Sequence, residues 1–139
     1  MDSPSSASDH NDASKLRQAL VDDLMSRGHV NTSLVEAALR QVPRHLFVPD
    51  VPLDRGYNDE AIVTKKNAEG VPISSASQPA IIAIMLEQLD LQPGHRVLEI
   101  GAGTGYNACL MAHIVGDTGQ VVTMDIDQDL VEGAREHLE

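Results

Sequence analysis

Aromatic residues are nearly absent from this sequence. Its 139 residues include no tryptophan, two tyrosines and one phenylalanine. Any core must therefore be built from Leu, Ile, Val, Ala and Met. Hydrophobic residues make up 42% of the chain, which is enough for one domain of ordinary size.

Basic residues are also few. Lys and Arg total 10 against 21 Asp and Glu, which gives a formal net charge of −11. A nucleic-acid binder gathers basic residues on one face to neutralise phosphates, and the only adjacent basic pair here is Lys65-Lys66. We therefore expect neither nucleic acid nor an anionic membrane as a partner.

Cysteine occurs once, as Cys109, so no internal disulfide can form. This suits a reducing cytoplasm, where we expect the protein to reside. Cys109 lies in an apolar run, which indicates a small buried hydrophobe rather than a nucleophile. No apolar stretch approaches the roughly 20 residues of a membrane span, and no secretory signal or metal site is evident.

The pattern of the chain predicts three parts. Residues 1–13 are rich in Ser and Asp, with little to bury, and are expected to be a disordered tail. Residues 14–92 should hold helices and a substrate-side loop: apolar spacing predicts helices over 14–27, 33–41 and 78–90, and the turn-rich stretch 43–75 permits only short extended pieces such as Ala61 to Thr64. Residues 93–139 should form strand, glycine loop, helix, strand and helix, an α/β arrangement.

The most informative segment is the glycine loop after the apolar strand Arg96 to Ile100. Glycines 101, 103 and 105 occupy alternate positions, and such residues serve where the backbone takes a positive φ or touches a ligand. The dinucleotide pattern G-x-G-x-x-G fails because its third position is Tyr106, and the Walker pattern fails because no Gly-Lys-Ser/Thr follows. The loop instead matches the first motif of class I methyltransferases, including Glu99 two residues before it.

An acid closes the second expected strand, Gln120 to Met124. A carboxylate at Asp125 can accept hydrogen bonds from both hydroxyls of a ribose, although the spacing alone also suits an NAD site. The resemblance to methyltransferases implies S-adenosyl-L-methionine as the cofactor and assigns Asp125 to its ribose and Ile126 to its adenine. The full set of cofactor-binding residues implied is Glu99, Gly101, Ala102, Gly103, Gly105, Asp125 and Ile126.

Segments upstream narrow the resemblance. Val42 to Pro49, Tyr57 to Asp59 and Ser77-Gln78-Pro79 resemble landmarks of the protein-L-isoaspartate O-methyltransferase family. This resemblance, which covers about residues 15–139, implies carboxyl O-methylation of (iso)aspartyl groups in proteins or peptides. It makes Ser77 the catalytic serine beside the substrate carboxylate, and Ser75, Gln78 and Pro79 substrate-binding residues. A helix N-cap is the alternative role of Ser77.

Residues 60–76 depart from the family pattern, which is compatible with a divergent branch that modifies peptides. A small-molecule acceptor, a non-catalytic cofactor-binding module and, less favoured, an NAD-dependent enzyme stay open as alternatives. The expected fold is an N-terminal helical segment followed by the first half of a Rossmann-like class I methyltransferase sheet. We therefore expect the chain to be an N-terminal fragment with weak or absent activity alone. The oligomeric state is not predicted.

Overall fold

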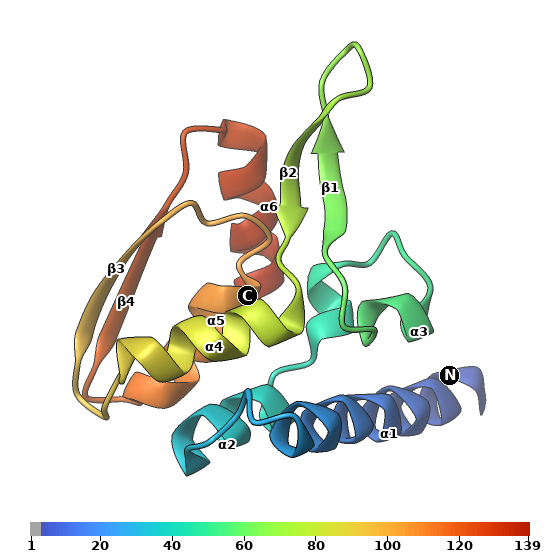
Figure 1. Cartoon of the computed structure of the whole chain (residues 1–139). Coiled ribbons are helices and arrows are strands. Elements are labelled where there is room, and N and C mark those ends of the chain that lie inside the picture. Colours follow the sequence, from blue (N-terminus) through green and yellow to red (C-terminus); the bar gives the residue numbers. More distant parts are fainter. Residues whose placement is uncertain (1–3) are drawn as a thin grey trace.

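The computed structural model describes residues 4–139, with side chains from residue 8 onward (Figure 1). The chain starts with two helices, α1 (Pro4–Ser26) and α2 (Ser33–Gln41), followed by the 3-10 helix η1 (Arg44–Phe47) and the short helix α3 (Leu53–Gly56). The prediction of a disordered tail was wrong for residues 4–13, which extend α1. Residues 1–3 lie outside the described residues. Extending an existing helix costs little, because only nucleation is unfavourable.

A β-hairpin follows the N-terminal helices and stands apart from them in Figure 1. It pairs β1 (Ile62–Lys66) with β2 (Pro72–Ala76) antiparallel, in a register that joins Ile62 to Ala76 and shifts twice toward the turn. The sequence predicted only the first of these strands. Strand β2 runs directly toward Ser77, so the hairpin delivers that residue to its place.

The rest of the chain is the expected βαβα unit, preceded by α4 (Pro79–Leu89). Strands β3 (Arg96–Ile100) and β4 (Gln120–Met124) pair in parallel, joined by α5 (Tyr106–Val115), and α6 (Gln128–Leu138) follows. Asp127 caps α6, its carboxylate accepting from the backbone N–H groups of Asp129 and Leu130. These elements bring the ends of β3 and β4 together at one edge, where the glycine loop lies.

Burial of the two parallel strands is one-sided. The sequence suggested that both faces were buried, but exposed and partly buried residues alternate along each strand. Val97 and Val121 pack on the core, whereas the opposite face exposes apolar residues, namely Leu98, Ile100, Val122 and Met124. Continuous apolar runs are typical of parallel strands covered on both sides, so this face has the composition of a buried one without a cover in the described residues.

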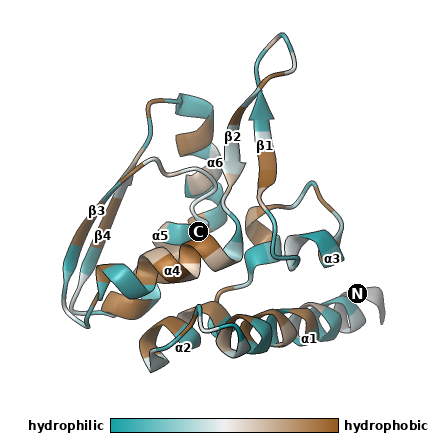
Figure 2. Cartoon of the chain, in the orientation of Figure 1, coloured by the Kyte–Doolittle hydropathy of each residue, from teal (hydrophilic) through white to brown (hydrophobic). Residues whose placement is uncertain are grey.

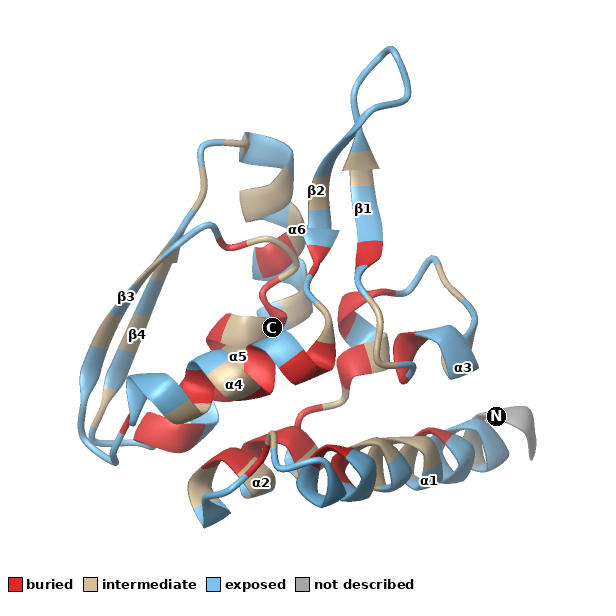
Figure 3. Ribbon diagram, in the orientation of Figure 1, coloured by how far each residue is buried: buried red, intermediate tan, exposed pale blue. Residues whose placement is uncertain are grey.

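One core unites the N-terminal helices with the βαβα unit. Buried side chains from α1, α2, α4 and α5 form a single cluster that includes Leu24, Leu39, Leu86 and Leu110. Figure 2 shows the apolar character of α4 and α5, and Figure 3 shows buried residues concentrated on the helices while the hairpin tip stays exposed. The helices therefore form a fixed base for the glycine loop. Within the described part of the chain, no helix is both long and apolar enough to cross a membrane.

The start of α2 is held by a residue from α4. The spacing of Ser33 and Glu36 suggested a capping box, but the N-cap residue is Thr32, and its side chain makes no capping bond. Instead the Glu87 carboxylate accepts hydrogen bonds from the backbone N–H groups of Asn31 and Thr32 and from the Thr32 hydroxyl. Glu36 pairs with Arg40 one turn later. A tertiary contact thus satisfies backbone donors at the start of α2.

Candidate functional site

The glycine loop is fixed by β4. All three of its glycines have positive φ, with values of 96° at Gly101, 54° at Gly103 and 90° at Gly105. The backbone N–H groups of Gly101 and Ala102 both donate to the carbonyl of Met124, at 2.7 and 2.9 Å. The N–H of Gly103 donates to Asp125 Oδ2 at 3.2 Å. These N–H groups donate to acceptors of the protein itself, and they therefore fix the position of the loop.

The three glycines differ in what surrounds them. An added Cβ at Gly101 or Gly103 would meet nothing within 4 Å, so open space lies beside these two positions. At Gly105 it would lie 3.2 Å from Leu138 Cγ and 3.3 Å from Ala134 Cβ. Gly105 thus allows α6 to pack closely, and the space for a ligand lies at Gly101 and Gly103.

Glu99 anchors the loop to its neighbours. Its Oε1 accepts from the Thr123 hydroxyl at 2.6 Å, and its Oε2 accepts from Asn107 Nδ2 at 2.7 Å. Asn107 Oδ1 is buried and has no hydrogen-bond partner among the described residues. A buried acceptor without a donor is costly, and it marks a place where a ligand donor would be stabilised.

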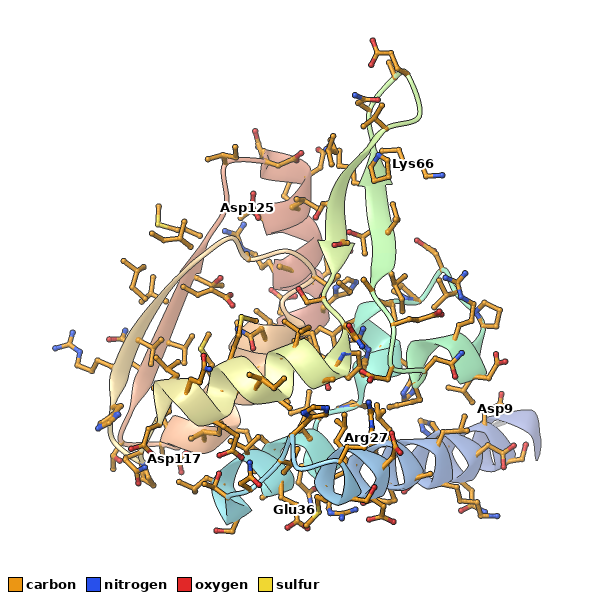
Figure 4. All side chains as sticks on the ribbon, viewed as in Figure 1. Asp9, Arg27, Glu36, Lys66, Asp117 and Asp125 are labelled. Atoms are coloured by element: carbon orange, nitrogen blue, oxygen red, sulfur yellow. The ribbon has the colours of Figure 1, made fainter. Side chains whose placement is uncertain are left out.

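Asp125 closes β4 as predicted, at the turn into α6 (Figure 4). Besides holding Gly103, its carboxylate accepts from the N–H of Asp127 at 3.1 Å. Each oxygen keeps a second lone pair, so the same carboxylate could also accept from a ligand. Ile126 is fully exposed beside it. Neither residue lines the cavity described next.

One cavity joins the glycine loop to the end of the hairpin. Six of the sequence-predicted site residues line it: Ser75, Ser77, Glu99, Gly101, Ala102 and Gly103. Ser77 is exposed, and it is not the N-cap of α4, because Gln78 occupies that position. The cavity thus brings the expected catalytic serine and the expected cofactor loop, which are more than 20 residues apart, to one place.

Gln78 and Pro79 lie outside this cavity. Pro79 is buried in the first turn of α4, and Gln78 Nε2 donates to Asp59 Oδ2 at 3.2 Å. Asp59 also accepts from the N–H of Ala80 at 2.8 Å and pairs with Arg27 of α1 at 2.8 Å. Burial acts to raise the pKa of Asp59, but these hydrogen bonds outweigh it and lower the pKa below its usual range. Asp59 therefore fixes the backbone next to Ser77.

Sequence reasoning assigned no role to Arg44, which also lines the cavity. This side chain is almost fully buried, and its Nη2 donates to the carbonyl of Ser77 at 3.1 Å. Tyr106, at the start of α5, is buried under it, and burial raises the pKa of the phenol, so the ring is neutral at physiological pH. Among the described residues, no cluster of His, Cys, Asp and Glu is placed to hold a metal ion.

A parallel strand, glycine loop, helix and strand closed by an acid define the α/β fold of the methyltransferase class. A family model described as protein-L-isoaspartate(D-aspartate) O-methyltransferase (PCMT) matches residues 14–139, and the chain belongs to this family.

Known relatives agree with this assignment. The protein-L-isoaspartate O-methyltransferases of Methanopyrus kandleri and Methanothermobacter thermautotrophicus are 39% and 41% identical, over 89% and 88% of this chain. The chain spans about half of their length, 52% and 54%.

Solved structures share the fold. A protein-L-isoaspartate O-methyltransferase matches with a TM-score of 0.77 and 34% identity, over 88% of this chain and 38% of that one. A beta-aspartate methyltransferase (PCMT) from Plasmodium falciparum, in complex with S-adenosyl-L-homocysteine, matches with a TM-score of 0.74 and 23% identity, over 88% of this chain and 54% of that one.

Proposed function

We propose that the protein is an S-adenosyl-L-methionine-dependent methyltransferase that esterifies (iso)aspartyl carboxylates of proteins or peptides. The observation that carries this proposal is the single cavity shared by the glycine loop and Ser77. The names of the relatives support the reaction, and the S-adenosyl-L-homocysteine bound to the Plasmodium protein supports the cofactor. The single cysteine supports a cytoplasmic location.

The residues present fit the cofactor. Gly101 and Gly103 leave room beside the loop that any side chain would fill. The unpaired Asn107 Oδ1 and the carboxylate of Glu99 suit the ammonium group of its methionine portion, and Asp125 suits the ribose. When bound, the cofactor supplies a methyl group already activated on a sulfonium.

The chain's own residues then need only to orient the acceptor and exclude water. An acceptor carboxylate is ionised near neutral pH, because its pKa in solution is about 4, so no general base is required. In this proposal the Ser77 hydroxyl donates to one carboxylate oxygen and leaves the other free to attack. Holding the reacting atoms in line lowers the barrier, because translational and rotational freedom has already been lost on binding. Ser75, which shares the cavity, would contact the peptide.

Two measurements on the purified full-length protein test the proposal, because the chain spans about half the length of its curated relatives. Calorimetric titration should give saturable binding of S-adenosyl-L-homocysteine and none of NAD. Incubation with methyl-labelled cofactor and a peptide that contains isoaspartate should add about 14 Da, and the label should leave on mild base treatment, as a methyl ester requires. The same peptide with ordinary aspartate identifies the acceptor. Cofactor binding without transfer to either peptide would favour a non-catalytic module, and NAD binding would contradict the proposal.

A further inference from the structure

The guanidinium of Arg44 is held rigidly beside the cavity. Its Nε donates to the carbonyl of Gly56 at 3.0 Å and its Nη2 to the carbonyl of Ser77 at 3.1 Å. The carbon between its nitrogens lies 5.0 Å from the centre of the Tyr106 ring, within range of a cation–π contact. The third nitrogen, Nη1, is buried and has no hydrogen-bond partner among the described residues.

No carboxylate among the described residues pairs directly with this charge, and Asp59 stabilises it only at longer range. None of the ion pairs between described residues includes Arg44. The carboxylates of Asp59 and Glu99 already have other partners. Asp59 pairs with Arg27, and Glu99 accepts from Thr123 and Asn107. Burial lowers the pKa of Arg44, but arginine starts so high that the group stays charged at neutral pH. A buried, unpaired cation is costly, so the site is incomplete without an anion.

Given the proposed function, on which this inference rests, we propose that Arg44 recognises the ionised carboxylate of the acceptor. The carbonyl of Ser77 accepts a hydrogen bond from Arg44, and both residues line one cavity. An acceptor oriented by the Ser77 hydroxyl therefore lies close to the positive charge of the guanidinium. The guanidinium charge stabilises the carboxylate, one oxygen of which is held by the Ser77 hydroxyl. The second oxygen keeps its lone pairs and attacks the methyl carbon.

This arrangement selects between acceptors and between substrate and product. A carboxamide of the same shape carries no charge and cannot complete the ion pair. In the transfer, the carboxylate oxygen forms a bond to the methyl carbon while the carbon–sulfur bond breaks and its electron pair stays on sulfur. The acceptor loses its negative charge, so the ester is held less tightly than the carboxylate and can leave.

The test compares two peptides that differ only in isoaspartate or isoasparagine. Their affinities are measured by calorimetry with S-adenosyl-L-homocysteine present, for the wild type, Arg44→Met and Arg44→Lys. Arg55→Met is the control, because Arg55 is exposed and pairs only with Glu60. We expect the wild type and Arg55→Met to prefer the carboxylate by about tenfold or more, as a charge-assisted hydrogen bond allows. Arg44→Met should abolish the preference and Arg44→Lys should keep part of it, with cofactor affinity unchanged in all.

Equal affinity of the wild type for both peptides would overturn the inference. So would an Arg44→Met variant that prefers the carboxylate as strongly as the wild type does, or one that loses affinity equally for both peptides. Should Arg44→Met not fold, the guanidinium nitrogen signals of the wild type give the answer: the carboxylate peptide should shift the Arg44 signal and the amide peptide should not. An unshifted signal would contradict the inference. Failure of the proposed function would instead show as absent cofactor binding or absent methyl transfer. The inference predicts neither of these results.

Discussion

Lys65 of the hairpin and Asp127, the N-cap residue of α6, form an ion pair with 2.6 Å between Nζ and Oδ2. A second acid in the first turn of α6, Asp129, lies 3.3 Å from the same nitrogen. The hydrogen bond from Lys65 lowers the pKa of Asp127, and the bond to Asp127 raises the pKa of Lys65. The hairpin that leads into Ser77 is thus tied to the helix that follows Asp125.

Replacing Lys65 by Gln should loosen the hairpin. The matched control is Lys66→Gln, on the adjacent residue toward the hairpin tip, for which the structure gives no ion pair (Figure 4). Hydrogen exchange of the β1 and β2 amides should quicken roughly twofold to fivefold in Lys65→Gln alone, as partly exposed ion pairs allow. The difference should shrink in high salt, because ions screen such pairs. Equal exchange in the two variants would show that the pair does not hold the hairpin.

Asp125→Ala should weaken binding of S-adenosyl-L-homocysteine by about 10-fold or more, because it removes a charged acceptor and the bond that holds the Gly103 N–H. Asp117→Ala is the control, since Asp117 is exposed in the turn before β4, at the far end of the strand (Figure 4). Calorimetric titration of both variants makes the comparison. Unchanged affinity in Asp125→Ala would remove Asp125 from the cofactor site.

Two glycines outside the loop should respond oppositely to alanine. An added Cβ at Gly119 would lie 2.5 Å from Val115 Cβ and 2.6 Å from the His95 carbonyl oxygen, so Gly119→Ala should lower the free energy of unfolding by about 1–3 kcal/mol. Gly133 lies within α6 with nothing within 4 Å of an added Cβ. Gly133→Ala should therefore raise the free energy of unfolding by about 0.5–1 kcal/mol. Urea unfolding of both variants checks the signs, and a stabilised Gly119→Ala would be inconsistent with the packing described.

The contribution of Asp59 to stability should depend on pH. Because the folded pKa is depressed, the ionised carboxylate stabilises the protein fully above its unfolded value of about 3.9, and this contribution is lost as the pH falls through the lower folded value. The urea midpoint of Asp59→Asn should lie below that of the wild type at neutral pH, and the gap should narrow as the pH falls below about 4. Asp54→Asn, on an exposed residue of α3, should show no such gap. A gap that persists in acid would contradict the assignment.

The sequence predicted the elements after residue 78 closely because local signals set their limits. Glycines with positive φ end β3, Pro79 starts α4, and Asp127 caps α6. Strand β2 was missed because Pro72 and two serines lack strand propensity, and pairing with β1 supplies what they lack.

Other features required contacts that the sequence does not display. Arginine is ordinarily exposed, so the burial of Arg44 follows only from the meeting of Gly56, Ser77 and Tyr106, three separate segments. The capping of α2 by Glu87 arises in the same way, because the two residues are brought together by helix packing. Of the candidate site, the glycine loop was predictable and the buried Arg44 beside it was not.

The carbonyl of Met124 accepts from two consecutive amides of the glycine loop, so the loop depends on a strand made about 20 residues after it. During synthesis the loop leaves the ribosome first, without its anchor, and its two amides find their acceptor only when β4 has emerged and aligned beside β3. Domains are generally made and folded from the N-terminus, and in this protein the glycine loop can take its final shape only after β4 has followed it.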